Sequence, residues 1–457
     1  MADDDKRAHG PSASRLIALH ALQPTARSRE VARMAMLDCL ACIVAGSATT
    51  PARIALELAL GQGAQGVATV LGTRERLAPA PAAFVNGVAG HALDFDDMTA
   101  IMIGHPSVVL VPAILALAQT RGLSPGAVLD AYVAGFEYAT WFARRMIPRH
   151  YDEGWHSTSS IGVFGATAAC ARLIGLDAEA TLNALAIAAS GACGLRANFG
   201  SMTKSLHAGQ AAEAGVRAAL LSDRGFTANT SVFDDANGFF ALYGIQSPQR
   251  YALADDALEI DVTGIGLKPY ACCGAGVSAM DAAIDTFAAH APKADDIVAI
   301  DCRVSHMATR IMPYAQATDG FQAKYCLPYC VAVALLDGRG AIAQFEDARV
   351  TRDDVQRLMQ RVRVTADDAM VQGDGRFGIE LRTSLRDGRV LVKSLDMPRG
   401  HPGRPLSDAE LATKFMSCTT PVLGSAQATQ ALAAFRRLEH LDDISALVEL
   451  HCPASQP

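Results

Sequence analysis

The sequence predicts a mainly α-helical protein with a large all-helical domain and a smaller α+β lid domain. Aromatic residues make up only 6% of the 457 residues and alanine is abundant, which favours closely packed helices over an all-β architecture. Strand patterns occur after about residue 265. Because the chain is too long for one hydrophobic core, we expect a helical domain over 1–265 and 400–457 and a lid over 266–399.

Helix signals follow one another through the first 265 residues. Ser28 can cap a helix that ends near Gly46, and Ser124-Pro125 combines a cap with proline at the first helical position. The segment from Gly162 to Gly175 is rich in small residues and predicts a helix that neighbouring backbones approach closely. Similar helices are expected over 179–194 and 208–225.

The pattern changes in the predicted lid. Residues 297–304 are rich in β-branched side chains, and residues 379–385 and 389–395 alternate around Asp387-Gly388, which favours a β-hairpin. We expect a further strand near 362–364 and helices over 275–290, 321–337 and 352–361.

The last fifty residues return to a helical pattern. Ser407-x-x-Glu410 is a capping box at the start of a helix. Further helices are expected near 425–436 and 441–450, and together they can pack back on the first domain.

Charge and hydropathy exclude several classes of partner. The formal net charge of −7 argues against nucleic acid and anionic membranes. The N-terminus is acidic and lacks the apolar core of a signal peptide, and no apolar run reaches the roughly eighteen residues of a membrane span. We therefore expect a cytoplasmic protein. An anionic substrate is compatible with this charge if its pocket supplies local cations.

The cysteine and glycine patterns favour no cofactor. The chain has eleven cysteines, an odd number that does not fit a secreted disulfide framework. Cys39 and Cys42 lie in an apolar helical run without a second such pair, which favours buried small residues over a zinc site. Neither an iron–sulfur cysteine set nor a glycine-rich phosphate loop is present, so the sequence predicts neither metal nor nucleotide binding.

The segment from His91 to Asp97, followed by Gly104-His105-Pro106-Ser107, places three aspartates and two histidines within fifteen residues. Its surroundings are small and apolar, where an unpaired charge is costly. Such a cluster is either a satisfied core network or a site that moves protons. In a helix Asp94 and Asp97 share a face and Asp96 points elsewhere, so one close pair provides a base and an acid. The alternative is that one of these aspartates caps a neighbouring helix and another faces solvent.

His105 and His156 are two candidates for proton transfer. Pro106 presses His105 towards an extended conformation, and His156 precedes a run of hydroxyl residues that can cap a helix. Histidine titrates near neutrality, which suits an acid or a base. A structural role is the alternative for each.

Cationic and phenolic side chains complete the candidate site. Lys204 and His207 share a helix face, and a lysine in apolar surroundings suits capture of a carboxylate, unless it extends to solvent. Lys268 lies where the composition changes, at an expected cleft between domains. Tyr329 either donates a hydrogen bond to an anion or packs in the core.

Taken in order, these segments resemble the MmgE/PrpD family over residues from about 30 to about 420. The resemblance is carried by His-Ala-Leu-Asp-Phe-Asp-Asp at 91–97, Gly-His-Pro-Ser at 104–107, Gly-Trp-His-x-Thr at 154–158, Met-Thr-Lys-x-Leu-His-x-Gly at 202–209, Val-Phe-Asp-Asp-Ala-x-Gly at 232–238, Lys-Pro-Tyr at 268–270, Ala-Lys-Tyr at 323–325 and Ala-Leu-Leu-Asp-Gly at 334–338.

The resemblance implies a homodimer whose subunits bind small polycarboxylates in a cleft between the two domains, without metal or organic cofactor. Family members include 2-methylcitrate dehydratase, cis-aconitate decarboxylase and iminodisuccinate epimerase. By similarity, the catalytic positions are Asp94, His105, His156, Lys204 and Tyr329. The substrate-binding positions that fall in the same motifs are His207 and Lys268.

Two residues depart from the family pattern. Dehydratase and decarboxylase members usually carry threonine where this chain has Met98, and histidine where it has Val277. Both departures remove a polar group that can meet a tricarboxylate.

The resulting prediction is a cofactor-independent hydro-lyase that acts on a di- or tricarboxylate by acid–base proton transfer next to a carboxylate. Lys204, Lys268 and a protonated histidine bind the carboxylates, His105 or Asp94 handles the proton, and His156 or Tyr329 acts on the opposite side. The alternatives are a dicarboxylate epimerase, a cis-aconitate-type decarboxylase and a non-catalytic polycarboxylate-binding protein.

Overall fold

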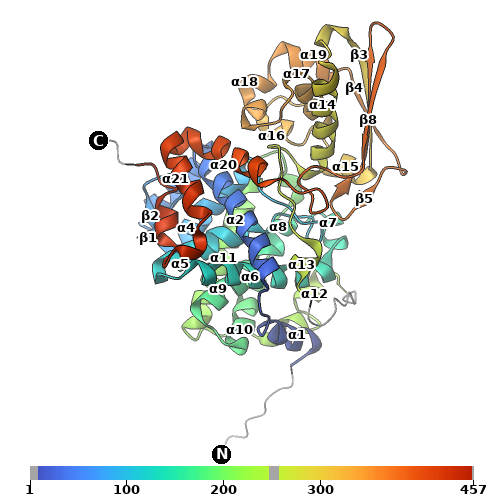
Figure 1. Cartoon of the computed structure of the whole chain (residues 1–457). Helices are drawn as coiled ribbons and strands as arrows, with labels where there is room; N and C mark the ends of the chain where they lie inside the picture. Colours follow the sequence, from blue (N-terminus) through green and yellow to red (C-terminus); the bar gives the residue numbers. More distant parts are fainter. Residues whose placement is uncertain (1–8, 246–256, 455–457) are drawn as a thin grey trace, which may run out of the picture.

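The computed structural model describes residues 9–245 and 257–454. Figure 1 shows a large helical body and a smaller part that carries a β-sheet and projects from one side of it. This arrangement confirms the predicted fold class, mainly α with a smaller α+β part. The division at residues 265 and 400 remains a prediction.

The helical body is built mostly from the first half of the chain. Its longer helices are α1 (Pro11–Leu19), α2 (Ala26–Ser47), α3 (Thr50–Gly61), α4 (Pro79–Ala92), α5 (Ser107–Arg121), α6 (Pro125–Met146), α9 (Gly162–Ile174), α10 (Ala178–Ala189) and α11 (Thr203–Asp223). Short helices lie between and after them: α7 (Arg149–Asp152), α8 (Ser157–Ser160), α12 (Phe239–Leu242) and α13 (Glu259–Thr263).

Local capping chemistry explains several of these helix boundaries. The Ser124 side chain accepts a hydrogen bond from the Ala127 amide, as its sequence predicts, and α9 ends at Gly175 in the left-handed conformation. Ser28 is not the cap of α2. The cap is Thr25, and Ser28 is its reciprocal partner three residues later in a capping box.

The C-terminal helices α20 (Asp408–Leu423), α21 (Ser425–Phe435) and α22 (Ser445–Glu449) return to the helical body, where α20 packs against α2. The predicted capping box of Ser407 and Glu410 starts α20. Inside the contact, the Lys414 ammonium lies 2.5 Å from Asp38 and donates to the carbonyl of Phe95 at 2.7 Å. The buried ion pair therefore ties the C-terminal helices to α2, and the hydrogen bond to Phe95 ties them to the loop that follows α4.

Helices α4 and α11 cross at a glycine contact that brings their functional ends together. A Cβ at Gly209 would lie 2.5 Å from the carbonyl oxygen of Phe84, and a Cβ at Gly87 would lie 2.8 Å from the Cα of Gly209. Such distances leave no room for a side chain. The close approach sets the end of α4 beside the start of α11, where Lys204 and His207 lie.

We expect Gly209→Ala to lower the free energy of unfolding by about 1–3 kcal/mol, because the added methyl group forces two backbones apart. Gly61→Ala is the matched control: Gly61 is also helical, and no heavy atom lies within 4 Å of its added Cβ. Urea unfolding of both variants checks the result. Equal stability of the two variants would contradict the close packing of α4 on α11.

The smaller part contains a four-stranded sheet in the order β4-β3-β7-β8. Its strands are β3 (Ile297–Val304), β4 (Val362–Ala366), β7 (Ile379–Leu385) and β8 (Val390–Leu395), and β3 is parallel to β4 and antiparallel to β7. The predicted hairpin is confirmed, with Gly388 in a left-handed turn between β7 and β8. Helices α14 (Val277–His290), α17 (Leu327–Asp337) and α19 (Asp353–Met359) accompany the sheet.

Two features of this part differ from the predicted elements. The single helix expected over 321–337 is divided into α16 (Gly320–Ala323) and α17, because Pro328 starts a new helix. Short ladders were not predicted, since strands of a few residues carry little periodicity. They are β1 (Gln65–Thr69) with β2 (Arg76–Leu77), and β5 (Gln372–Gly373) with β6 (Arg376–Phe377). Short helices α15 (His306–Ile311) and α18 (Asp347–Val350) complete this smaller part.

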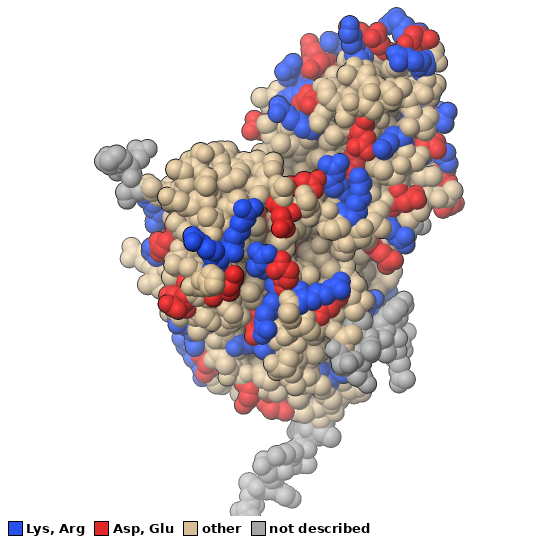
Figure 2. Space-filling view, in the orientation of Figure 1, with Lys and Arg blue, Asp and Glu red and all other residues tan. Residues whose placement is uncertain are grey.

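Within the described residues no single helix has both the length and the apolar composition needed to cross a bilayer, although the bent pair of α2 and α3 meets both measures together. Figure 2 shows basic and acidic side chains interspersed over the visible face. The predicted lack of a membrane or nucleic-acid partner remains a prediction.

Candidate functional site

The helix expected through the aspartate cluster ends before the aspartates. Helix α4 stops at Ala92, and Asp94 has a left-handed backbone with φ of 51°. The side chains of Asp94, Asp96 and Asp97 therefore diverge instead of following helical spacing. The predicted pairing of Asp94 with Asp97 is wrong, and each carboxylate has its own set of partners.

Asp94 is the centre of a buried cationic cluster. The Lys268 ammonium lies 2.6 Å from one carboxylate oxygen, and the Lys204 ammonium lies 3.1 Å from the other, which also accepts a hydrogen bond from the Tyr325 hydroxyl. Burial opposes ionisation, but the charges of the two lysines outweigh it and hold the pKa of Asp94 well below its ordinary value. An ionised carboxylate held by three donors positions cations and is a poor base.

Asp96 links two histidines. One carboxylate oxygen lies 2.7 Å from His91 Nδ1 and 3.4 Å from His105 Nδ1. Burial opposes its charge, yet the neighbouring imidazoles keep the pKa of Asp96 below its ordinary value. A carboxylate in this place stabilises a positive charge that forms on either ring. Helical spacing predicted that Asp96 points away from the site, so the sequence did not identify its role.

Asp97 belongs to the scaffold behind the cluster. It accepts hydrogen bonds from the Ser107 hydroxyl and from the Ser107 amide, and that hydroxyl lies 2.5 Å from the Tyr132 hydroxyl. Burial raises the pKa of Asp97 well above its ordinary value, and the neighbouring carboxylates of Asp38 and Asp96 add to the rise. This network fixes the start of α5 beside the loop.

His105 is oriented by backbone groups. Its Nδ1 lies 2.6 Å from the Asp97 carbonyl oxygen, which only accepts hydrogen bonds, so Nδ1 carries the proton and Nε2 carries a lone pair. Burial lowers the pKa of His105 well below its ordinary value, which keeps the ring neutral. The His105 amide donates to the Thr158 hydroxyl at 3.1 Å, and the Ser157 hydroxyl donates to Ile103, so two distant loops are joined.

His156 and His207 form an imidazole pair, with their Nδ1 atoms 3.0 Å apart. One ring donates and the other accepts. In the tautomer in which His207 donates, His156 carries its proton on Nε2; in the tautomer in which His156 donates, its Nε2 carries a lone pair. Burial lowers the pKa of His156 well below its ordinary value and that of His207 to about 4. The His156 ring also stacks on His91, with centroids 5.6 Å apart. The His156 and His207 rings are therefore neutral near pH 7.

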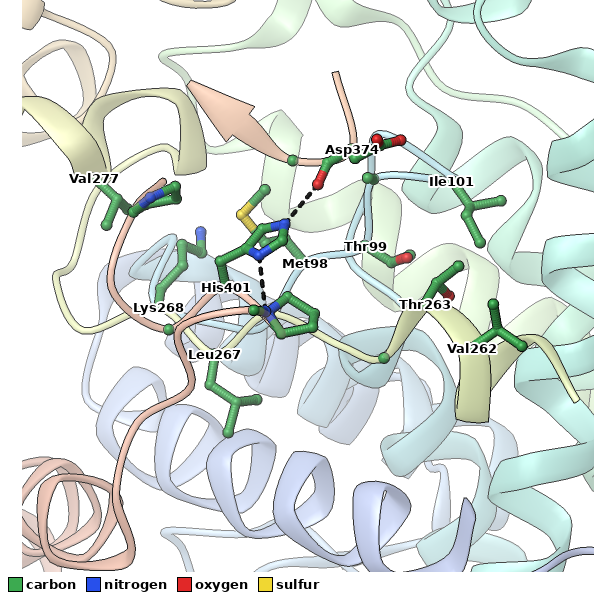
Figure 3. A pocket seen from close by; sticks show the side chains of 18 of the residues that line it. Met98, Thr99, Ile101, Val262, Thr263, Leu267, Lys268, Val277, Asp374 and His401 are labelled. Carbon is green, nitrogen blue, oxygen red and sulfur yellow. Dashed lines mark hydrogen bonds between the residues drawn. The ribbon is translucent and has the colours of Figure 1, made fainter. Parts of the chain in front are cut away.

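Two cavities open beside these residues. The inner cavity has a volume of about 150 Å³ and is lined by His105, His156, Lys204 and Tyr325 among others. The outer cavity, of about 600 Å³, is lined by Lys268, Val277 and His401 among others. Figure 3 shows Lys268, Val277 and Met98 on one side of the outer cavity and Val262 and Thr263 on the other.

Tyr329 does not join the cluster. It is buried in α17, where its hydroxyl donates to the Gln344 carbonyl and its ring packs near Phe345. Tyr325 lies in the cluster where Tyr329 was expected, with its ring 5.4 Å from the Lys204 ammonium. The apolar run after Tyr329 already indicated a core helix, whereas Tyr325 directly follows Lys324 in the Ala-Lys-Tyr motif.

The structure brings together Asp94, His105, His156, Lys204, His207 and Lys268 from the predicted set. It adds His91, Asp96, Tyr325 and Lys324. Lys324 donates to the Ala92 carbonyl at 3.0 Å, and burial lowers the pKa of Lys324 to about 8. These additions lie within or next to motifs visible in the sequence, but their directions depend on where the helices end.

Comparison with known families agrees with this geometry. Residues 14–252 match the MmgE/PrpD N-terminal domain, and residues 270–440 match the MmgE/PrpD C-terminal domain. The chain belongs to the MmgE/PrpD family. The two matches cover most of the chain and include every residue of the cluster except Lys268, which lies between them.

Three relatives of this MmgE/PrpD chain have the names of lyases. The chain is 29% identical to cis-aconitate decarboxylase from Homo sapiens, covering 96% of this chain and 94% of the relative. It is 24% identical to cis-aconitate decarboxylase from Aspergillus terreus, with 94% and 92% covered. It is 28% identical to 2-methylcitrate dehydratase from Cupriavidus necator, with 74% of each chain covered.

Among the described residues of this MmgE/PrpD chain, one group of side chains has the spacing of metal ligands, and some of its atoms are engaged in hydrogen bonds. His91, Asp96 and His105 place ligand atoms within 4.8 Å of one another. However, His91 Nδ1 is bonded to Asp96, and His105 Nδ1 is bonded to the Asp97 carbonyl. An ion bound through the two Nδ1 atoms would have to replace these bonds, whereas His91 Nε2 and one Asp96 carboxylate oxygen have no hydrogen-bond partner. The predicted absence of a metal remains a prediction.

Buried neutral histidines make the stability of the MmgE/PrpD fold sensitive to acid. Burial lowers the pKa of His150 and of His451 to about 4, against about 6.5 in an unfolded chain. The unfolded state therefore binds more protons below pH 6.5, and stability is lost as the pH falls from 6.5 towards 4. We expect each of these two histidines to lower the free energy of unfolding by roughly 2 kcal/mol between pH 7 and pH 5.

Urea unfolding at pH 7 and pH 5 measures this loss. His451→Phe should reduce the loss by roughly 2 kcal/mol, the contribution of this one histidine, whereas His440→Gln, at an exposed position, should leave the loss unchanged. An equal loss in wild type and His451→Phe would show that His451 is charged in the folded protein.

Proposed function

We propose that this chain is a lyase that transfers a proton at the carbon next to a carboxylate of a small polycarboxylic acid, with hydro-lyase chemistry as the first candidate. The observation that carries the proposal is the combination, in one cavity, of the Lys204 ammonium and a neutral His105 whose Nδ1 is committed to a backbone carbonyl. Cation and base are the two requirements for removing such a proton.

In this mechanism Lys204 binds the substrate carboxylate. His105 Nε2 takes the proton from the adjacent carbon, and the resulting imidazolium is stabilised by Asp96, 3.4 Å from Nδ1. Lys204 then faces the negative charge that develops on the carboxylate. Asp94 is assigned a positioning role, because its two lysines and Tyr325 occupy its oxygens.

The second proton transfer is assigned to His156. When His207 donates in the pair between the Nδ1 atoms, His156 carries its proton on Nε2 and can give it to a departing hydroxyl group, which leaves as water. The substrate then gains a carbon–carbon double bond. The proton that His105 took up returns through solvent to the imidazole pair, so that each ring regains its starting protonation. His207 and Lys268 complete the proposed binding site.

A second candidate is a dicarboxylate epimerase, in which the proton returns to the opposite face of the same carbon. The apolar side chains of Met98 and Val277 in the outer cavity favour it, because they offer no hydrogen bond to a third carboxylate or a hydroxyl group. A third candidate reaction is decarboxylation, because two relatives are named cis-aconitate decarboxylase. In that reaction the substrate loses carbon dioxide and the carbon that bore it is protonated.

The test is incubation of the protein with a panel of di- and tricarboxylic acids in deuterated water, followed by NMR. A new alkene signal indicates a dehydratase, a product one carboxylate smaller indicates a decarboxylase, and deuterium exchange without net conversion indicates an epimerase. If no acid exchanges or reacts, the proposal fails, and thermal stabilisation by the same acids would then identify a binding protein. The homodimer and the cytoplasmic location remain predictions, and light scattering tests the first.

A further inference from the structure

Met98 lies in the wall between the inner and outer cavities. The residues that line both cavities are Met98, Thr99, Ala100, Asp374 and Gly375. The proton-transferring rings and Lys204 lie on the inner side, and Lys268 and Val277 lie on the outer side. The cleft of this chain is therefore two chambers that share one wall.

The Met98 segment is held in place by its backbone and by two glycines. The Met98 amide donates to Gly266 and the Gly266 amide donates to Met98, both at 2.8 Å. A Cβ at Gly274 would lie 2.4 Å from the Met98 sulfur, so the side chain lies directly on that glycine. Any larger residue at position 274 would push the thioether out of the wall.

The lid supplies the other half of the wall. The β5–β6 turn has three successive left-handed residues, Gly373, Asp374 and Gly375. The Asp374 carbonyl accepts a hydrogen bond from His401 Nε2 at 2.6 Å, and His401 Nδ1 accepts one from the Gly403 amide at 3.0 Å, as Figure 3 shows for His401 and Asp374. A Cβ at Gly375 would lie 3.6 Å from the Ala100 Cβ, so the turn meets the Met98 segment.

The size and charge of the inner chamber limit its ligand. A cavity of about 150 Å³ is the size that encloses benzene, and a tricarboxylate has about twice as many non-hydrogen atoms. Lys204 is the lysine that lines this chamber, whereas Lys268 lines the outer one and is bound to Asp94 from that side. An acid with three carboxylates must extend past Met98 into the outer chamber.

We propose that Met98 is a specificity-determining residue, which divides the cleft and makes the chain prefer a small dicarboxylate to a tricarboxylate. The inference rests on the proposed function for the location of the site, and it narrows the substrate class. Truncation of Met98 joins the two chambers and admits the larger acid.

Binding of two unreactive probes tests the proposal. Succinate represents the dicarboxylates and tricarballylate the tricarboxylates, and calorimetry gives Kd for each. We expect wild type to bind succinate more tightly. Met98→Ala should improve tricarballylate binding relative to succinate at least tenfold, and Met98→Thr should act in the same direction if the alanine variant does not fold. Met98→Leu, which keeps most of the side-chain volume, should retain the wild-type ratio.

Three results overturn the inference: tighter binding of tricarballylate by wild type, an unchanged ratio in Met98→Ala and Met98→Thr, or no binding of either probe. The binding assay tests the role of Met98, whereas the acid panel in deuterated water tests the proposed function. A failure of one proposal can therefore be distinguished from a failure of the other. A protein that binds succinate selectively through Met98 but converts no acid would retain the inference and lose the lyase proposal.

Discussion

Lys204→Met is expected to lower kcat/KM at least a thousandfold on whichever acid the panel identifies. The Lys204 ammonium lies in the inner cavity and supplies both the substrate contact and the charge that stabilises the transition state. A thousandfold loss corresponds to about 4 kcal/mol of transition-state stabilisation, which is reasonable for a cation in a water-poor site. The measurement is steady-state kinetics beside thermal unfolding of the same sample.

The fold should survive this substitution, because Asp94 retains Lys268 and Tyr325 as partners. His105→Gln should cause a loss of similar size, since it removes the proposed base. Lys393→Met is the matched control: this lysine pairs with Asp285 in the lid and is partly exposed. Full activity of both Lys204→Met and His105→Gln would remove the mechanism.

Asp94→Asn is expected to lower the free energy of unfolding by about 3–5 kcal/mol, the usual cost of removing one member of a buried ion pair. The amide leaves Lys204 and Lys268 without their carboxylate, although both ammonium groups stay buried. Activity should fall as well, because the lysines are then no longer held in place. Urea unfolding at pH 7 measures the first effect and the deuterium assay measures the second.

Asp130→Asn provides the comparison, because Asp130 pairs with Arg29 at the surface. Exposed ion pairs contribute about 0–1 kcal/mol, so this variant should unfold close to wild type. If the two variants lose the same small amount of stability, Asp94 is not the anchor of the cluster.

Much of the architecture follows from short-range signals. The strand over residues 297–304, the Asp387-Gly388 turn and the caps at Ser124 and Ser407 were predicted from neighbouring residues, and the structure confirms each. These features depend on side-chain alternation and on capping groups a few residues away, which a sequence displays directly. The family motifs likewise marked most segments that meet in the site.

The direction of individual side chains depended on contacts between distant segments. Asp96 faces two histidines because α4 ends at Ala92, and Tyr325 replaces Tyr329 because α17 turns the latter towards Gln344. Likewise, Met98 lies between the two cavities only because Gly274 contacts its side chain and the Gly375 turn meets the neighbouring Ala100.

Chemical identity and local helix or strand formation are properties of neighbouring residues, so they were readable in the chain. Orientation, protonation and cavity shape arise from burial and from partners up to hundreds of residues away. The energy of those contacts is set by packing in three dimensions, which local patterning does not encode.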